Sequence, residues 1–211
     1  MPGKREEKRD DLRERLVAAA TARIARSGLA GLRARDVTSD AGCALGALYT
    51  AFEDLDGLIY AVTARTLAAL EHALREAVAA ESASGRQLQR LGATYLGFAR
   101  SQPHLWRALF EHRVAGDAPA PEWHAARQTA LLQLIAGPLG RLQPDLDETE
   151  LMVRSRTLFA AVHGIVSISL ENRFIGIPTT TLDAELDRFV GLVVTGLTQT
   201  QPPPADRRGR R

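Results

Sequence analysis

The segment from Leu32 to Phe52 constrains the fold more than any other part of the chain. Its apolar residues recur at spacings of three and four on either side of Ala41-Gly42-Cys43, which predicts two short helices joined by a tight turn. Gly42 suits this turn because a residue that ends one helix and redirects the chain often needs a positive φ. Such a pair is typical of a helix-turn-helix, whose second helix enters the DNA major groove, but it also occurs as plain core structure.

Positive charge lies before the proposed turn. Residues 1–35 hold ten Lys or Arg against five Asp or Glu, whereas residues 36–60 hold five acidic residues and no basic ones. Lys4 and Arg5 either meet DNA phosphates or belong to a solvated helix end on which the charges alternate in sign. A basic arm beside a helix-turn-helix is therefore a candidate phosphate contact.

The proposed reading helix, residues 44–51, carries no charge. Its apolar side chains can touch thymine methyl groups, and two of its residues carry a hydroxyl that can form a hydrogen bond. None of its side chains can make a bidentate hydrogen bond to a base. Arg33 and Arg35 open the preceding helix and are expected to contact phosphate, and Arg35 is the best candidate for a guanine contact. The other residues expected to face DNA are Ala44, Leu45, Gly46, Ala47, Tyr49 and Thr50.

The remaining sequence predicts helices only, which gives an all-α fold of about nine helices in a small head and a larger bundle. Gly28 is suited to end the first helix, Pro103 to begin one, and Asp54 and Asp147 to cap the helices after them.

The predicted elements group into three parts of the chain. We expect a helix-turn-helix domain over residues 1–53 and a ligand-binding and dimerisation domain over residues 54–200. Residues 201–211 form a tail of proline and arginine that cannot build a core, so disorder is expected there.

The last two predicted helices are apolar around most of their circumference, so each must bury more than one face. Another subunit is the usual second cover in a small body, and we expect a homodimer through a four-helix bundle. A central helix that is covered within one chain would show the same pattern. The residues expected at the interface are Leu158, Val162, Ile165, Leu186, Phe189, Val190, Val193 and Leu197.

Aromatic residues gather in two segments of the body. Five of the eleven aromatic residues of the chain lie there, and a histidine follows the last of them. This concentration fits either a pocket for a small molecule or a dense core, and the histidine either binds a ligand or satisfies a backbone carbonyl. The candidate pocket residues are Tyr95, Phe98, Trp106, Phe110, Phe159 and His163.

No pattern in the chain indicates catalysis. Gly-rich phosphate loops, HExxH and Gly-x-Ser-x-Gly are absent, and no two histidines lie three or four residues apart. We therefore expect no enzyme activity, no cofactor and no metal. The charged amino terminus does not suit a secretory signal, and no run of about 18 apolar residues is present, so we expect a cytoplasmic protein with no membrane segment.

Residues 32–58 resemble the DNA-reading head of the TetR family of regulators. The body segments 95–110 and 159–164 resemble the ligand domain of the TetR subgroup named for its Trp-His-Gly residues, with Phe159 in the place of the tryptophan. The positions of the head that match are Leu32, Asp36, Val37, Ala41, Gly42, Gly46, Leu48, Tyr49, Phe52 and Leu58.

The resemblance implies a ligand-responsive transcriptional regulator. It would be a dimeric repressor that a small apolar effector releases from a palindromic operator in double-stranded DNA, with Tyr49 anchored to phosphate. The head departs from the family at Arg33, Ala44, Leu45 and Leu55, which replace a Thr, a Ser and two Lys. These departures leave open a ligand- or lipid-binding protein of the same fold that has lost sequence-specific DNA binding.

Overall fold

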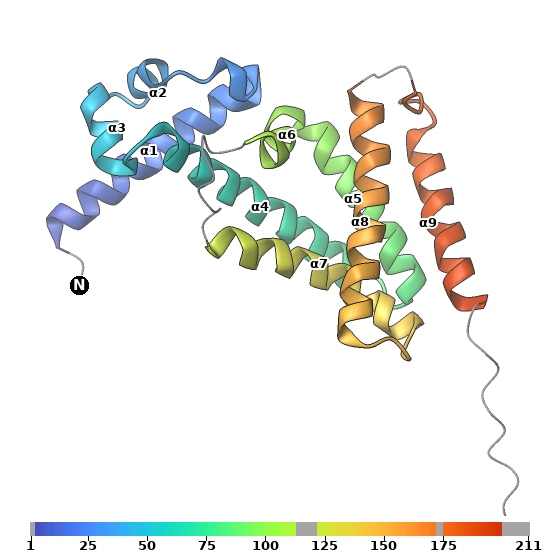
Figure 1. Cartoon of the computed structure of the whole chain (residues 1–211). Helices are drawn as coiled ribbons and strands as arrows, with labels where there is room; N and C mark the ends of the chain where they lie inside the picture. Colours follow the sequence, from blue (N-terminus) through green and yellow to red (C-terminus); the bar gives the residue numbers. More distant parts are fainter. Residues whose placement is uncertain (1–2, 113–121, 172–174, 200–211) are drawn as a thin grey trace, which may run out of the picture. The chain divides into compact units, whose positions relative to one another are not determined.

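A computed structural model describes residues 3–112, 122–171 and 175–199, and only the backbone of Lys4 and of residues 122–125. These residues form nine α-helices and one 3-10 helix, η1, and this part of the chain contains no strand (Figure 1). The all-α prediction is confirmed, and the expected tail lies outside the described residues. The elements are α1 (Lys4–Ser27), η1 (Leu29–Gly31), α2 (Ala34–Asp40), α3 (Leu45–Phe52), α4 (Leu55–Ala79), α5 (Ser84–Ser101), α6 (Pro103–Glu111), α7 (Glu122–Leu142), α8 (Glu148–Leu170) and α9 (Leu182–Gln199).

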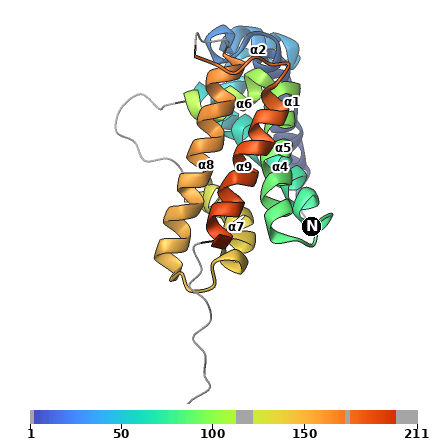
Figure 2. The ribbon, with the colours of Figure 1, turned by 90° about the vertical axis from the view of Figure 1, so that its right-hand side faces the viewer.

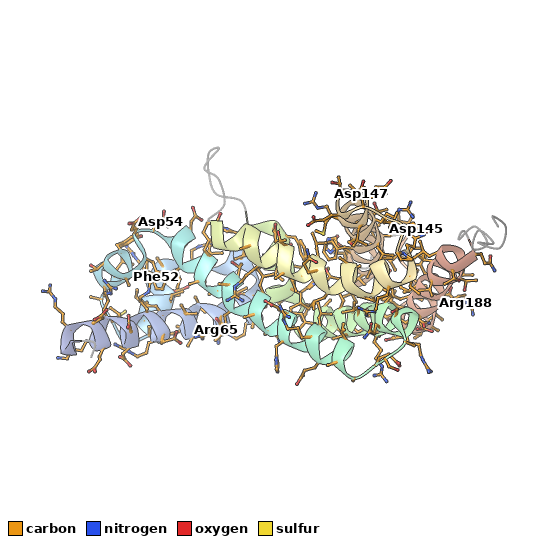
Figure 3. All side chains as sticks on the ribbon, turned by 90° about the horizontal axis from the view of Figure 1, so that it is seen from below. Phe52, Asp54, Arg65, Asp145, Asp147 and Arg188 are labelled. Atoms are coloured by element: carbon orange, nitrogen blue, oxygen red, sulfur yellow. The ribbon has the colours of Figure 1, made fainter. Side chains whose placement is uncertain are left out.

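Local signals in the sequence set several helix ends. Gly28 closes α1 with φ +68°, and Pro103 is the first residue of α6. Asp147 caps α8 through a reciprocal pair of hydrogen bonds, and Asp54 accepts a 2.7 Å hydrogen bond from an amide in the first turn of α4 (Figure 3). Because each signal acts within one helical turn, the sequence was sufficient to place it.

The chain divides into two compact units. The first comprises the described residues of 1–72 and 97–127, and the second comprises those of 73–96 and 128–211. The division differs from the expected boundary between residues 53 and 54, because the first part of α4 and all of α6 belong to the first unit. Helices α4, α5 and α7 each begin in one unit and continue into the other.

The first unit is built on one face of α1. Leu16, Ala20 and Ile24 on that face are fully buried, and they join a core to which α2, α3, the start of α4 and α6 contribute. Helices α2, α3 and α6 all pack against α1. The helix-turn-helix therefore rests on α1, with α3 held to the core by Leu48 and Phe52.

The second unit is a helical bundle in which α8 and α9 pack side by side (Figure 2). Buried leucine and valine side chains of α5, α7, α8 and α9 form its core. Helix α8 is long and apolar enough to cross a membrane by length and composition alone, which the sequence analysis did not anticipate. Only 17% of its most apolar stretch is buried within the chain.

Candidate DNA interface and effector site

The turn between α2 and α3 has the geometry that the sequence predicts. Gly42 adopts φ +65°, a conformation that side-chain-bearing residues rarely take. The Cys43 amide donates a 3.0 Å hydrogen bond to the carbonyl of Thr38, which ties the turn to α2. The chain then re-enters a helix at Leu45, so α3 leaves the turn in a new direction.

Helix α3 has one buried and one exposed side. Leu48, Ala51 and Phe52 are buried, whereas Tyr49 exposes 49% of its surface. The Thr50 hydroxyl donates a 3.0 Å hydrogen bond to the Gly46 carbonyl, so its oxygen remains as an acceptor. The exposed residues of the reading face are Ala44, Leu45, Gly46, Tyr49 and Thr50, and Ala47 is half-buried.

The basic residues predicted to contact DNA differ in the contacts that their side chains make. Arg33 precedes α2 and donates to the carbonyls of Ala30 and Leu32 at 2.8 and 2.9 Å. The Arg35 side chain is exposed and makes no hydrogen bond or ion pair with any described residue, so its guanidinium is available to a ligand. Arg5 is also exposed, while the side chain of Lys4 lies outside the described residues.

Arg23 of α1 pairs with both acidic residues of α2. Its guanidinium makes hydrogen bonds of 2.6 and 2.9 Å to the two carboxylate oxygens of Asp40, and it lies 3.2 Å from the carboxylate of Asp36. The hydrogen bond with Asp40 raises the pKa of Arg23 and lowers the pKa of that carboxyl. The sequence reasoning missed this cluster, because 17 residues separate Arg23 from Asp40 and no local spacing links them.

Three of the six candidate pocket residues meet in the second unit. The Tyr95 hydroxyl and His163 Nδ1 share a 2.8 Å hydrogen bond. Phe159 stacks on the His163 ring at a centroid distance of 5.7 Å and meets the Tyr95 ring edge-on at 5.8 Å. Burial lowers the pKa of His163, opposed by the charge of Glu171, so the neutral imidazole predominates at pH 7. We call Tyr95, Phe159 and His163 the aromatic cluster.

The other three candidates belong to the first unit. Trp106 is fully buried and meets Phe110 edge-on at a centroid distance of 5.7 Å. Phe98 is buried as well, while Phe110 is exposed. The structure therefore divides the six predicted pocket residues into two groups of three, and Trp106 is a core residue.

The expected interface residues divide in the same way between core and surface. Val162, Leu186 and Val190 are buried within the single chain, the last two to 1% exposure, so little of their area is left for a partner. The half-buried members are Leu158, Ile165, Phe189, Val193 and Leu197. The exposed large apolar side chains of α8 and α9 are Val153 and Leu192, at 55% and 67% exposure, and neither was among the expected residues.

No group of three or more His, Cys, Asp or Glu side chains is arranged to hold a metal ion in the described part of the chain.

The described geometry is that of an all-helical protein in which a helix-turn-helix rests on α1. Residues 88–193 match the family model described as Tetracyclin repressor-like, C-terminal domain. This match covers half of the chain, and the chain belongs to the TetR family of transcriptional regulators. The match does not confirm the resemblance to the Trp-His-Gly subgroup. A comparison with curated protein sequences gives no match.

Solved structures share the fold at low sequence identity. A protein of unknown function from Rhodococcus sp. RHA1 is 22% identical with a TM-score of 0.69, covering 89% of this chain and 94% of that one. A regulatory protein in the TetR family from Rhodococcus RHA1 is 15% identical with a TM-score of 0.63, covering 88% and 96%. RolR, solved with the ligand resorcinol, is 16% identical with a TM-score of 0.61, covering 93% and 97%.

Proposed function

We propose that the protein is a ligand-responsive repressor that binds a palindromic DNA operator as a homodimer. The observation that carries the proposal is the exposed, uncharged face of α3, with Tyr49 on it and Arg35 available beside it. A helix of this kind can lie in the major groove and touch thymine methyl groups, while an arginine at its edge reads guanine or binds phosphate. The expected site of action is the cytoplasm.

The surface of α8 supports dimerisation. Val153, Thr157 and Ala160 are exposed at spacings of four and three, so they share one outer face, and Gly164 continues it. A Cβ on Gly164 would meet nothing within 4 Å, so this face is open in the single chain. An apolar helix that one chain leaves uncovered is buried at lowest cost against its symmetry mate.

A two-fold dimer supplies what one α3 cannot. Two reading helices roughly 34–36 Å apart can enter successive major grooves of one palindromic site. The interface that we propose uses the outer face of α8 and Leu192 of α9, together with the half-buried residues of the two helices. Leu186 and Val190 act within the chain as core instead.

The aromatic cluster is the proposed effector site. Two aromatic rings and a neutral imidazole offer an apolar surface, and the Tyr95–His163 hydrogen bond supplies polar atoms to orient a ligand. RolR, a neighbour in fold, was solved with resorcinol, a small aromatic molecule. We infer a small, mainly apolar aromatic effector, whose binding changes the spacing of the two heads and so releases DNA.

Binding to DNA from upstream of the protein's own gene tests the proposal, measured by fluorescence anisotropy against a random duplex. We expect the protein to prefer the upstream duplex. Its affinity for that duplex should fall about a thousandfold or more between about 50 and 200 mM salt if several phosphates are neutralised. Footprinting then gives the half-site spacing. Titrating resorcinol and other small phenols into the complex tests whether such a molecule releases the protein from DNA. Equal affinity for both duplexes would favour the ligand-binding protein that has lost DNA recognition, which the uncharged α3 also fits.

Replacing Arg35 with alanine tests the proposed base contact. We expect a loss of about tenfold to a hundredfold in affinity for the operator, with relaxed preference at one base pair, because a bidentate arginine–guanine contact is lost. The measurement is competition against operators substituted at single positions. Arg5→Ala is the matched control and should lower the affinity for every DNA sequence by the same factor. The same uniform loss in Arg35→Ala would make that residue a phosphate contact.

The histidine of the aromatic cluster should make stability depend on pH. Because burial lowers the pKa of His163 in the folded chain, the unfolded chain binds the proton more readily. Folding stability should therefore decrease as the pH falls below about 6.5, the ordinary histidine value, toward the lower folded pKa. Thermal denaturation between about pH 7.5 and 5.5 should show a smaller decrease in His163→Asn. Equal profiles for His163→Asn and the wild type would refute the prediction.

A further inference from the structure

The arginines of α1 divide into two groups in the structure. The side chains of Arg5 and Arg9 are exposed and make no hydrogen bond or ion pair with the described residues. Arg13 and Arg15 instead donate to backbone carbonyls of the helix-turn-helix, 38 and 26 residues away in sequence. Net positive charge alone would assign all four to phosphate, but the contacts of the second pair indicate another role.

Arg13 holds the last turn of α3 through two contacts. Its Nη1 donates a hydrogen bond to the carbonyl of Ala51. Its guanidinium carbon also lies 4.1 Å from the centroid of the Phe52 ring, and Figure 3 labels Phe52. The Ala51 carbonyl is one of the last four of α3, which have no partner within the helix, and a cation is favoured at this negative end of the helix dipole.

Arg15 acts in the same way on α2. Its Nη1 donates a 2.7 Å hydrogen bond to the carbonyl of Ala41, directly after the last residue of α2. Its Nε meets Asp11 at 3.0 Å, one helical turn earlier on α1, which orients the guanidinium toward the turn. Two guanidinium groups on one helix therefore hold the carboxyl-terminal ends of both helices of the motif.

The uncharged reading face makes such support necessary. Helix α3 has no basic side chain with which to anchor itself to phosphate, and its contacts with thymine methyl groups would be van der Waals contacts, which weaken sharply over less than 1 Å. Charge-assisted hydrogen bonds are about twice as strong as neutral ones and have defined geometry. Groups that fix the angle of α3 against α1 would therefore determine which sequence its face can fit.

We propose that Arg13 and Arg15 are positioning residues for sequence recognition, which orient α3 from α1 rather than binding phosphate. The proposal deepens the proposed function and rests on it, since it assigns specificity to residues that touch no base. It separates three roles within the first unit: Arg35 reads a base, Arg5 and Arg9 are available to phosphate, and Arg13 and Arg15 set the pose of the reading helix.

The test compares Arg13→Met with Arg9→Met, which removes an equal charge from the same helix. Arg13→Met should lower the ratio of operator affinity to random-duplex affinity about tenfold, as expected for one lost hydrogen bond to a charged group, with an unchanged salt slope. Arg9→Met should leave the ratio unchanged. Arg13→Lys keeps the charge and a donor and should recover part of the ratio. Arg15→Met, at the other helix end, should also lower the ratio.

A uniform loss for Arg13→Met, with the salt slope reduced by about one, would make Arg13 a phosphate contact and overturn the proposal. An unchanged ratio, or an Arg13→Lys variant as defective as Arg13→Met, would overturn it as well. These outcomes require that wild-type protein prefers its operator. If it does not, the proposed function fails by itself, and a measurement without DNA decides the positioning role.

That measurement is amide hydrogen exchange of the free protein. Faster exchange in α3 of Arg13→Met, with exchange in α1 and α4 unchanged, supports the positioning role. Exchange that rises equally in α1, α3 and α4 would mark Arg13 as a residue of general stability, and unchanged exchange would mark it as dispensable. Either of these two results overturns the proposal.

Discussion

Replacing Ala160 with arginine is expected to separate the protein into monomers and to lower its operator affinity by about two to four orders of magnitude. Ala160 lies on the exposed outer face of α8, where we propose that two copies meet. In a two-fold dimer the substitution introduces two arginines, each of which would have to lose its hydration without a partner. Once the heads are no longer joined, each binds its half-site alone.

The mass of Ala160→Arg in solution, from light scattering at micromolar concentration, tests the first half of this expectation. Affinity for the full palindrome and for one half-site tests the second, since only the full site should lose affinity. Ala69→Arg is the matched control, because Ala69 is an exposed alanine in the middle of α4. It should remain dimeric. A dimeric Ala160→Arg protein with wild-type affinity would place the subunit contact elsewhere.

The parts of the fold that sequence could predict depend on contacts within a few residues. Gly28, Gly42 and Asp147 signal helix ends because a positive φ or a capping side chain acts within one turn. The exposed face of α3 follows from the three- and four-residue spacing that buries Leu48 and Phe52. For the same reason the number of helices was accessible without coordinates.

Other features depend on which segments meet, and the sequence pattern does not contain that information. Periodicity marks Leu186 and Val190 as buried, but it does not say whether their cover is the same chain or a partner, and the structure shows the same chain. The candidate pocket residues divide because α5 passes from one unit to the other between Leu96 and Gly97. Arg13 and Ala51 are joined across 38 residues, and such a pair leaves no local signal.

Replacing Gly57 with alanine is expected to destabilise the first unit by about 2 kcal/mol, the usual cost of an added methyl group in a filled space. A Cβ at this position would lie 2.4 Å from the backbone carbonyl oxygen of Phe52, which is too close for any real contact. The carbonyl belongs to the tight connection from α3 to α4, where Glu53 adopts φ +62° and the Asp54 amide bonds back to Phe52 at 2.6 Å. The backbone must therefore shift at the end of the reading helix.

We expect Gly57→Ala to lower both the urea midpoint of unfolding and the affinity for the operator, because the end of α3 that Arg13 holds would be displaced. Gly97→Ala is the matched control, since Gly97 lies exposed within α5 and its added Cβ would meet nothing within 4 Å. That variant should be about 0.5–1 kcal/mol more stable than wild type, as alanine favours helix over glycine. A Gly57→Ala protein as stable as Gly97→Ala would show that the connection between α3 and α4 yields without cost.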